Sequence, residues 1–155
     1  HFFRSTYGVV SQVLGPATLT LGYGNGDEAT VLTRGTPTTA SFYFRKTITV
    51  GGTVTKADLR VLHDDGVVVW VNGTQVFSKY VANGLAFSDW ASATSQNNEI
   101  STASIALTPS NPFLSGTNVI AAMVKQANTK MMICLKKPKF ILRPTAMGHI
   151  MRERI

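Results

Sequence analysis

The sequence has few of the features that mark disulfide chemistry, membrane insertion or disorder. Its single cysteine, Cys134, excludes an internal disulfide bond. Charged residues make up only 15% of the chain and hydrophobic residues 44%, which is the composition of a globular protein rather than a disordered one. No apolar run approaches the roughly 20 residues needed to cross a bilayer, so no membrane span is expected.

The sequence also lacks a helical hydrophobic period between Gly15 and Gln126. Val, Thr, Ile and Phe alternate with polar residues instead, and Gly, Asn, Asp and Pro interrupt them at short intervals. This pattern predicts an all-β fold, a single antiparallel β-sandwich of the jelly-roll type. The expected strands are Ala17–Leu21, Ser41–Val50, Ala57–His63, Val67–Val71, Thr74–Ser78, Ile100–Leu107 and Thr117–Lys125.

In two of these strands the pattern of apolar residues indicates which faces are buried. In Ser41–Val50, Phe42, Phe44, Ile48 and Val50 alternate along one face, which Lys46 interrupts, and this pattern indicates a half-buried strand. Thr117–Lys125 is apolar on both faces, which is typical of a central strand.

The stretch HDDGVVVWVNGTQVF, residues 63–77, reads as a tight hairpin with two apolar faces. Asn72-Gly73 favours a two-residue type I′ turn, because both positions of that turn need positive φ. A regular ladder then pairs Val71 with Thr74, Trp70 with Gln75, Val69 with Val76, and Val68 with Phe77. This register predicts a core face of Val67, Val69, Val71 and Val76, and a second face on which Trp70 and Phe77 are neighbours.

Positive charge is concentrated at the C-terminal end. Residues 1–127, the expected sandwich domain, hold eight Lys and Arg against seven acids. Residues 128–155 hold seven bases (Lys130, Lys136, Lys137, Lys139, Arg143, Arg152 and Arg154) against Glu153. These bases could meet phosphate, an anionic polysaccharide or an acidic surface of another subunit. Only Phe140 lies among them, so specific nucleic-acid binding by base stacking is not expected.

Several segments in order resemble one known family. LGYGNGDEATV (residues 21–31), FYFRKTITV, LRVLHDDGVVVWVNGTQVF and NVIAAMVKQ (residues 118–126) are similar to the galactose-binding-like jelly-roll modules of secreted, multidomain bacterial proteins. The resemblance runs from about Gly15 to Ala127. It implies a sandwich of about eight strands, akin to carbohydrate-binding modules, with no catalytic apparatus of its own and a possible structural Ca²⁺.

Both ends depart from that family pattern. The chain starts at His1 without an initiator methionine, so we expect a processed or excised piece from which a signal peptide could have been lost. The segment from Asn128 to Ile155 contains Cys134 and four of the five methionines. It is either a frameshifted or misassigned gene end, a replacement tail with its own role as an interchain arm, or a distant variant of the last strand.

Aromatic and polar residues around the hairpin form the candidate ligand site. Sugars stack their C–H faces on aromatic rings, while amide and carboxylate groups orient the hydroxyls. The candidates are Trp90, Trp70, Tyr80, Phe77, Gln75 and Asp89. The alternative is that the loop Val81–Gln96 folds over Trp70 and Phe77 as a small second core with Trp90 as its plug. We favour this alternative for Trp70 and weigh the two equally for Trp90.

Three other motifs have simpler interpretations. Asp27 and Glu28, in a glycine-rich loop, could ligate Ca²⁺, although their use as turn caps is favoured. The triplet His63-Asp64-Asp65 has no metal-site spacing, so we expect turn hydrogen bonds from the two aspartates and a packed histidine. The sequon Asn72-Gly73-Thr74 is accounted for by the hairpin turn.

Together these observations predict a non-catalytic accessory module of an extracellular or cell-surface protein, with a polysaccharide or surface glycan as its partner. No nucleophile–base pair, nucleotide-binding loop or metal quartet is recognisable in the sequence, so no enzyme activity is expected. The alternative is a structural or assembly subunit, such as a filament or adhesive component, whose terminal segments pair with neighbouring copies by strand addition.

Overall fold

A computed structural model describes residues 20–23, 30–32, 39–82, 86–95, 99–127 and 133–144. Its strands are β1 (Thr20–Tyr23), β2 (Thr30–Val31), β3 (Ser41–Val50), β4 (Val54–Asp64), β5 (Gly66–Val71), β6 (Thr74–Lys79), β7 (Glu99–Ser104), β8 (Gly116–Lys125) and β9 (Ile133–Pro144). These ranges contain no helix, and therefore none that could cross a membrane.

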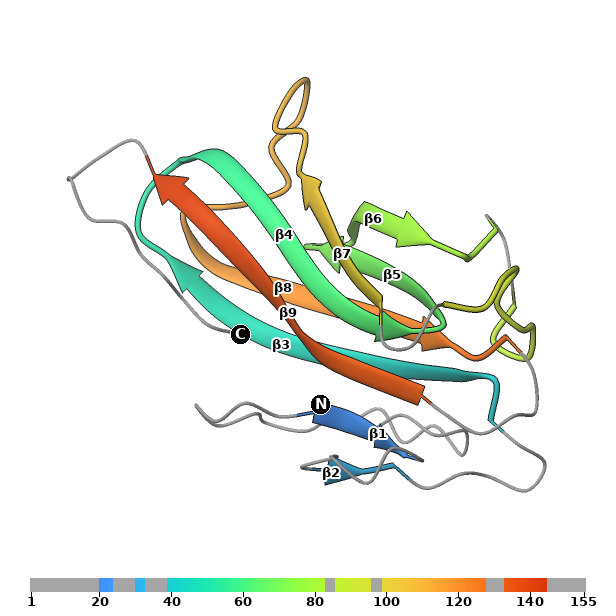
Figure 1. The fold of residues 1–155 in the computed structure, drawn as a ribbon. Coiled ribbons are helices and arrows are strands. Elements are labelled where there is room, and N and C mark those ends of the chain that lie inside the picture. The colour runs from blue at the N-terminus through green and yellow to red at the C-terminus, as the bar shows by residue number, and fades with distance from the viewer. Residues whose placement is uncertain are drawn as a thin grey trace.

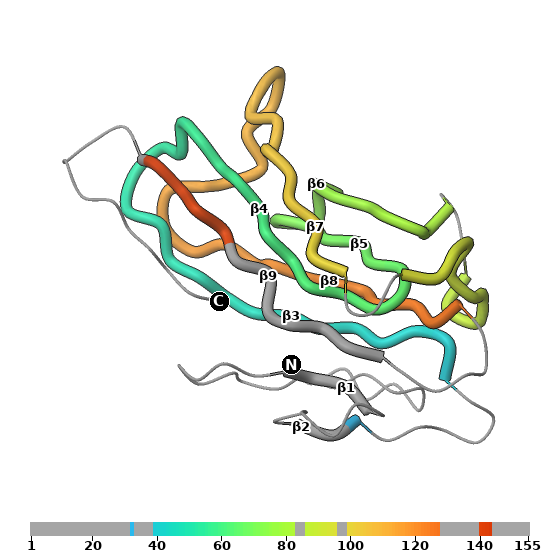
Figure 2. Tube along the Cα trace, in the orientation of Figure 1, coloured from blue at the N-terminus to red at the C-terminus, as the bar shows by residue number. Residues whose placement is uncertain are grey.

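The strands form two sheets that pack face to face, as the two layers in Figure 1 show. The five-stranded sheet has the order β2-β1-β9-β4-β7, and the four-stranded sheet has the order β3-β8-β5-β6. All described pairings are antiparallel except the short β1–β2 pair. From β3 onward the chain changes sheet at every connection except the β5–β6 hairpin, a path that can be followed in Figure 2. The predicted all-β sandwich is confirmed.

The core lies between the two sheets and is made of aliphatic and phenylalanine side chains. β3 contributes Phe42, Ile48 and Val50, with Phe44 packed against them, as the alternation in its sequence predicts. β8 lies between β3 and β5, which confirms the central position predicted from its two apolar faces. Across the sandwich, Phe113 and Phe140 meet edge to face with ring centroids 5.7 Å apart.

The basic C-terminal segment contains a strand of the sandwich. β9 pairs with β1 on one side and with β4 on the other, so it is an interior strand of the five-stranded sheet. Its register on β4 shifts between Arg60 and Leu62, whose partners are Lys139 and Lys136. Pro138 falls within this bulge, where a missing backbone N–H interrupts no ladder hydrogen bond. Of the three explanations for the segment, a last strand matches residues 133–144.

Candidate functional site

The β5–β6 hairpin begins as predicted and then departs from the regular ladder. Asn72 and Gly73 have φ values of 50° and 84°, which confirms the type I′ turn. Val71 pairs with Thr74 and Trp70 with Gln75, but Val69 pairs with Phe77 rather than with Val76. Val76 is the extra residue of a β-bulge, and the predicted register beyond Trp70 is therefore wrong.

The bulge separates the two aromatic residues that the regular register placed together. Phe77 stands opposite Val69 on the inner side of the sheet and packs against the core. Trp70 stays on the outer side, half-buried, next to Ala121 of β8 and opposite the exposed Gln75. The expected Trp70–Phe77 neighbour pair is therefore wrong, because one inserted residue turns the following side chains to the other face.

Residues 86–95 pack over one end of the outer face of the four-stranded sheet. Gly66 allows a close approach, since a Cβ atom there would lie 2.8 Å from Val81 Cγ2 and 2.9 Å from both the Tyr80 carbonyl oxygen and the Ala91 Cβ. The Phe87 ring stacks on Tyr43 of β3 at 5.8 Å between centroids. Val68 and Met123 on this outer face are 3% and 6% exposed. The loop thus covers a second apolar layer centred away from Phe77.

A buried lysine fixes this segment to the sheet. Lys125 is 0% exposed, and its Nζ donates to Ser41 Oγ at 2.7 Å, to the Ala86 carbonyl at 2.7 Å and to the Asp89 carbonyl at 2.9 Å. Ser41 Oγ in turn donates to the Phe87 carbonyl at 2.6 Å. Burial lowers the pKa of the Lys125 ammonium, while the Asp89 charge opposes that shift. All three N–H groups of the ammonium are therefore satisfied.

Two adjacent carboxylates hold the far end of the same segment. Ser95 Oγ donates to Asp64 at 2.7 Å, and the Ser95 backbone N–H donates to Asp65 at 2.9 Å. The second Asp65 oxygen accepts the Ala127 N–H at 2.8 Å. Burial, with a further contribution from Asp65, raises the pKa of Asp64 to about 6. The pair therefore bonds the covering loop and the end of β8, rather than the hairpin turn that the sequence suggested.

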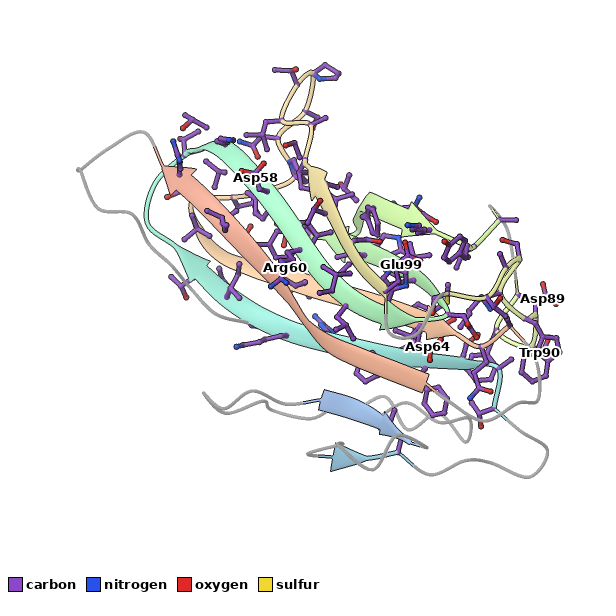
Figure 3. The ribbon with its side chains drawn as sticks, viewed as in Figure 1. Asp58, Arg60, Asp64, Asp89, Trp90 and Glu99 are labelled. Atoms are coloured by element: carbon purple, nitrogen blue, oxygen red, sulfur yellow. The ribbon has the colours of Figure 1, made fainter. Side chains whose placement is uncertain are left out.

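Trp90 lies in the middle of this anchored loop and is only half-buried. Both of its neighbours have fixed backbones, since the Asp89 carbonyl accepts from Lys125 and the Ala91 N–H donates to the Gln126 carbonyl at 2.6 Å. One oxygen of the Asp89 side chain accepts the Ala86 N–H at 2.7 Å, and the other bonds no described residue. Figure 3 shows Asp89 and Trp90 together at one end of the sandwich.

Tyr80 is engaged elsewhere, at the edge where β6 and β7 face each other across the sandwich. Its hydroxyl donates to Glu99 at 2.9 Å, and Lys79 forms an ion pair with the same carboxylate. The Lys79 and Tyr80 hydrogen bonds lower the pKa of Glu99, against the effect of burial. The structure therefore does not join Tyr80 with Trp70 and Phe77 in one platform.

A serine–histidine contact across β4 and β7 was not foreseen in the sequence. His63 Nδ1 lies 2.7 Å from the Asp65 carbonyl, which only accepts, so this nitrogen carries the proton and Nε2 accepts from Ser101 Oγ at 2.9 Å. Burial lowers the pKa of His63 and favours this neutral form. His63 and Ser101 are 0% and 6% exposed, so the pair offers a substrate no access and fits the packed role expected of His63.

Asn72 is a structural residue of the hairpin. Its Nδ2 donates to the Pro112 carbonyl and to Asn118 Oδ1, both at 2.8 Å, and its Oδ1 accepts the Val119 N–H at 2.8 Å. A glycan on this nitrogen would replace one of its two N–H donors and so break at least one of these bonds. This fits the turn role expected for the sequon.

No group of three or more His, Cys, Asp or Glu side chains gathers as a metal site in the ranges that the structure describes. Asp27 and Glu28, the candidate Ca²⁺ ligands, lie outside those ranges.

The described fold and site define an all-β protein of the β-sandwich class, with a loop anchored over one sheet. No protein-family model matches the chain, and no curated protein matches it in sequence. Two solved structures have a similar fold. One is an alpha-L-rhamnosidase from Dictyoglumus thermophilum, with 10% identity, a TM-score of 0.45, and coverage of 70% of this chain and 11% of that one. The other is an alfa-L-rhamnosidase from Aspergillus terreus, with 13% identity, a TM-score of 0.48, and coverage of 83% and 14%. This chain therefore spans only a small fraction of either protein.

Proposed function

We propose that this chain is a non-catalytic, galactose-binding-like accessory module of an extracellular protein, and that it binds carbohydrate through the loop containing Trp90. The observation that carries the proposal is the presentation of Trp90. Its ring is partly exposed and lies outside the core cluster, while the backbone on both sides is fixed by hydrogen bonds.

A rigid, exposed indole suits sugar binding because the flat C–H face of a pyranose ring packs on it. The indole has few rotatable bonds, and a loop that is ordered beforehand loses little entropy when a ligand binds. Such a site also needs polar groups that orient the hydroxyls. The Asp89 oxygen that bonds no described residue supplies an acceptor, and the exposed Ser88, Ser92 and Thr94 supply hydroxyls.

The remaining candidates divide into two groups under this proposal. Trp70 and Gln75 lie side by side on the same sheet face that the anchored loop partly covers, and we propose them as a secondary contact. Phe77 and Tyr80 serve the fold, through the core and through Glu99 respectively.

The assembly alternative loses part of its support. It relied on a last segment free to pair with another chain, whereas residues 133–144 pair on both sides within their own sheet. We therefore propose carbohydrate binding ahead of assembly.

Affinity electrophoresis against a panel of neutral polysaccharides tests the proposal. We expect retention by at least one polymer and its loss in Trp90→Ala, with a weaker effect in Trp70→Ala. Phe77→Leu is the matched control, since Phe77 belongs to the core. If no polymer retains the chain, or if Trp90→Ala is retained like the unmodified protein, the proposal is wrong.

A further inference from the structure

The outer face of the five-stranded sheet combines exposed cations with exposed aliphatic side chains. Strand alternation directs the core residues Ala57, Leu59 and Leu142 inward and their neighbours outward. The outward residues used below are Lys56 and Arg60 of β4, Ile100 of β7, and Ile141 and Arg143 of β9. Ile100 is 49% exposed and Ile141 is 38% exposed, and Lys56, Arg60 and Arg143 are exposed as well.

The charges on this face are unbalanced. Two acids of β4 have the alternation of this face, Asp58 and Asp64. Asp64 is 7% exposed and accepts from Ser95 Oγ, so Asp58 is the only one of the two that is not buried. Asp58 is already engaged by Lys56 at 3.2 Å and Ser104 at 2.7 Å. The Ser104 hydrogen bond, followed by that from Lys56, lowers the pKa of Asp58, which keeps it ionised and paired. Arg60 and Arg143 have no ion-pair partner among the described residues.

The pairing of β4 with β9 arranges these groups along a line. Lys56 is the partner of Arg143, Asp58 of Ile141, and Arg60 of Lys139. Four residues of strand separate the first and last of these pairs, a distance of about 13 Å. Cationic positions therefore lie at both ends of a stretch whose middle is the pair of Asp58, which is bonded to Lys56, and the exposed Ile141. Figure 3 shows Asp58 and Arg60 along this face, turned toward the viewer.

We propose that this outer face binds an extended anionic polysaccharide. Its carboxylate or sulfate groups pair with Arg60 and Arg143, whose planar guanidinium groups match such anions in two-pronged geometry. The apolar faces of the sugar rings lie on Ile100 and Ile141. The site is on the opposite sheet from the Trp90 loop and does not depend on the proposed function.

The same residues argue against a nucleic acid as the occupant. Single strands are held largely by stacking of bases on aromatic rings, and no described outward residue of β4, β7 or β9 is aromatic. Ile141 lies between the cationic positions and Ile100, opposite Leu62, lies beyond Arg60. This order fits a polymer that presents anionic groups and C–H surfaces in turn.

Titration of the full chain with two polymers tests the proposal and separates the two anion types. Polygalacturonate carries carboxylates, dextran sulfate carries sulfates, and unmodified dextran is the neutral control. We expect saturable binding to at least one of the charged polymers, and no binding to dextran in the Trp90→Ala variant. Arg60→Gln and Arg143→Gln should each weaken binding about two- to fivefold, and the double variant about tenfold.

Arg45→Gln is the matched control, because Arg45 is an exposed arginine on β3 of the other sheet. It should change affinity less than twofold. Trp90→Ala should also retain the charged polymer, so loss of the Trp90 site and loss of this one are distinguishable. Both arginine variants remove exposed side chains, and their melting temperatures show whether each is folded.

Three results would overturn the proposal. The first is a loss of polymer affinity in Arg45→Gln as large as in the Arg60 and Arg143 variants. The second is binding to duplex DNA or to phosphatidylserine vesicles as tight as binding to either polymer. The third is that neither charged polymer binds. The first two would mean that net charge alone attracts polyanions to this protein.

Discussion

Replacing Lys125 by methionine should loosen the Trp90 loop and destabilise the whole sandwich. The substitution keeps the length and most of the apolar volume of the side chain. It removes the three hydrogen bonds from Nζ and leaves the carbonyls of Ala86 and Asp89 without that donor. The loop retains its backbone hydrogen bonds, the Ser41–Phe87 hydrogen bond, the stacking of Phe87 on Tyr43, and the Asp64 and Asp65 bonds.

The magnitude follows from opposing contributions. Each hydrogen bond from a charged donor contributes about 1.5–3 kcal/mol, whereas the buried ammonium no longer has to be desolvated, so the net loss is about 3 kcal/mol. For a domain of this size, each kcal/mol lost from the free energy of unfolding lowers the melting temperature by about 2–4 °C. The melting temperature should therefore decrease by about 6–12 °C.

Thermal unfolding and hydrogen exchange measure the two consequences separately. We expect the lower melting temperature together with faster exchange of the Ala91 and Ser92 amides, which are bonded to the Gln126 and Tyr80 carbonyls. Lys46→Met is the matched control, because Lys46 is half-buried on β3 with no ion pair to a described residue, and it should change stability by less than about 0.5 kcal/mol. A decrease below 2 °C with unchanged exchange would refute the anchoring role of Lys125.

Three further substitutions test other contacts of the site. Gly66→Ala places a Cβ 2.9 Å from the Tyr80 carbonyl, so it should cost about 1–3 kcal/mol in chemical denaturation, and an unchanged midpoint would contradict the close approach. The pKa of Asp64 is raised to about 6, so ionising this carboxyl group opposes folding. The free energy of unfolding should therefore fall by about 2–3 kcal/mol between pH 4 and 6 because of Asp64. In Asp64→Asn this pH-dependent fall should be absent. Asn72→Asp keeps the turn but replaces a donor with a carboxylate facing Asn118 Oδ1, so urea unfolding should show a loss of about 2 kcal/mol, and equal stability would exclude the bonding described.

Much of the fold follows from local pattern. The alternation in Ser41–Val50 predicts β3 with its bounds and its inner face, and the Asn-Gly pair predicts the hairpin turn. Both depend on near neighbours in the chain, which is why the sequence is informative there. A last strand was only one of three explanations for the segment that contains β9, because the run Lys137-Pro138-Lys139 is typical of a strand break. The register shift on β4 accommodates this run in the structure.

The site was predicted less well because it depends on contacts distant in sequence. The bulge at Val76 has no clear signal in the hairpin sequence, yet it moves Phe77 to the other face. The anchoring role of Lys125 requires knowing that residues 86–89 return to β8, at a separation of 36 to 39 residues. The sequence identifies Trp90 as an aromatic residue in a polar loop. It does not show that the backbone on both sides of Trp90 is held by hydrogen bonds.

Fluorescence of Trp90 during a glycan titration tests the central claim most directly. The chain has two tryptophans, so Trp90 is the only one left in Trp70→Phe. With a polysaccharide that retains the protein, the account predicts a saturable change in emission and a lower rate of acrylamide quenching as the sugar covers the indole. Retention of the protein with unchanged emission and quenching would contradict it, because the bound glycan would then lie away from Trp90.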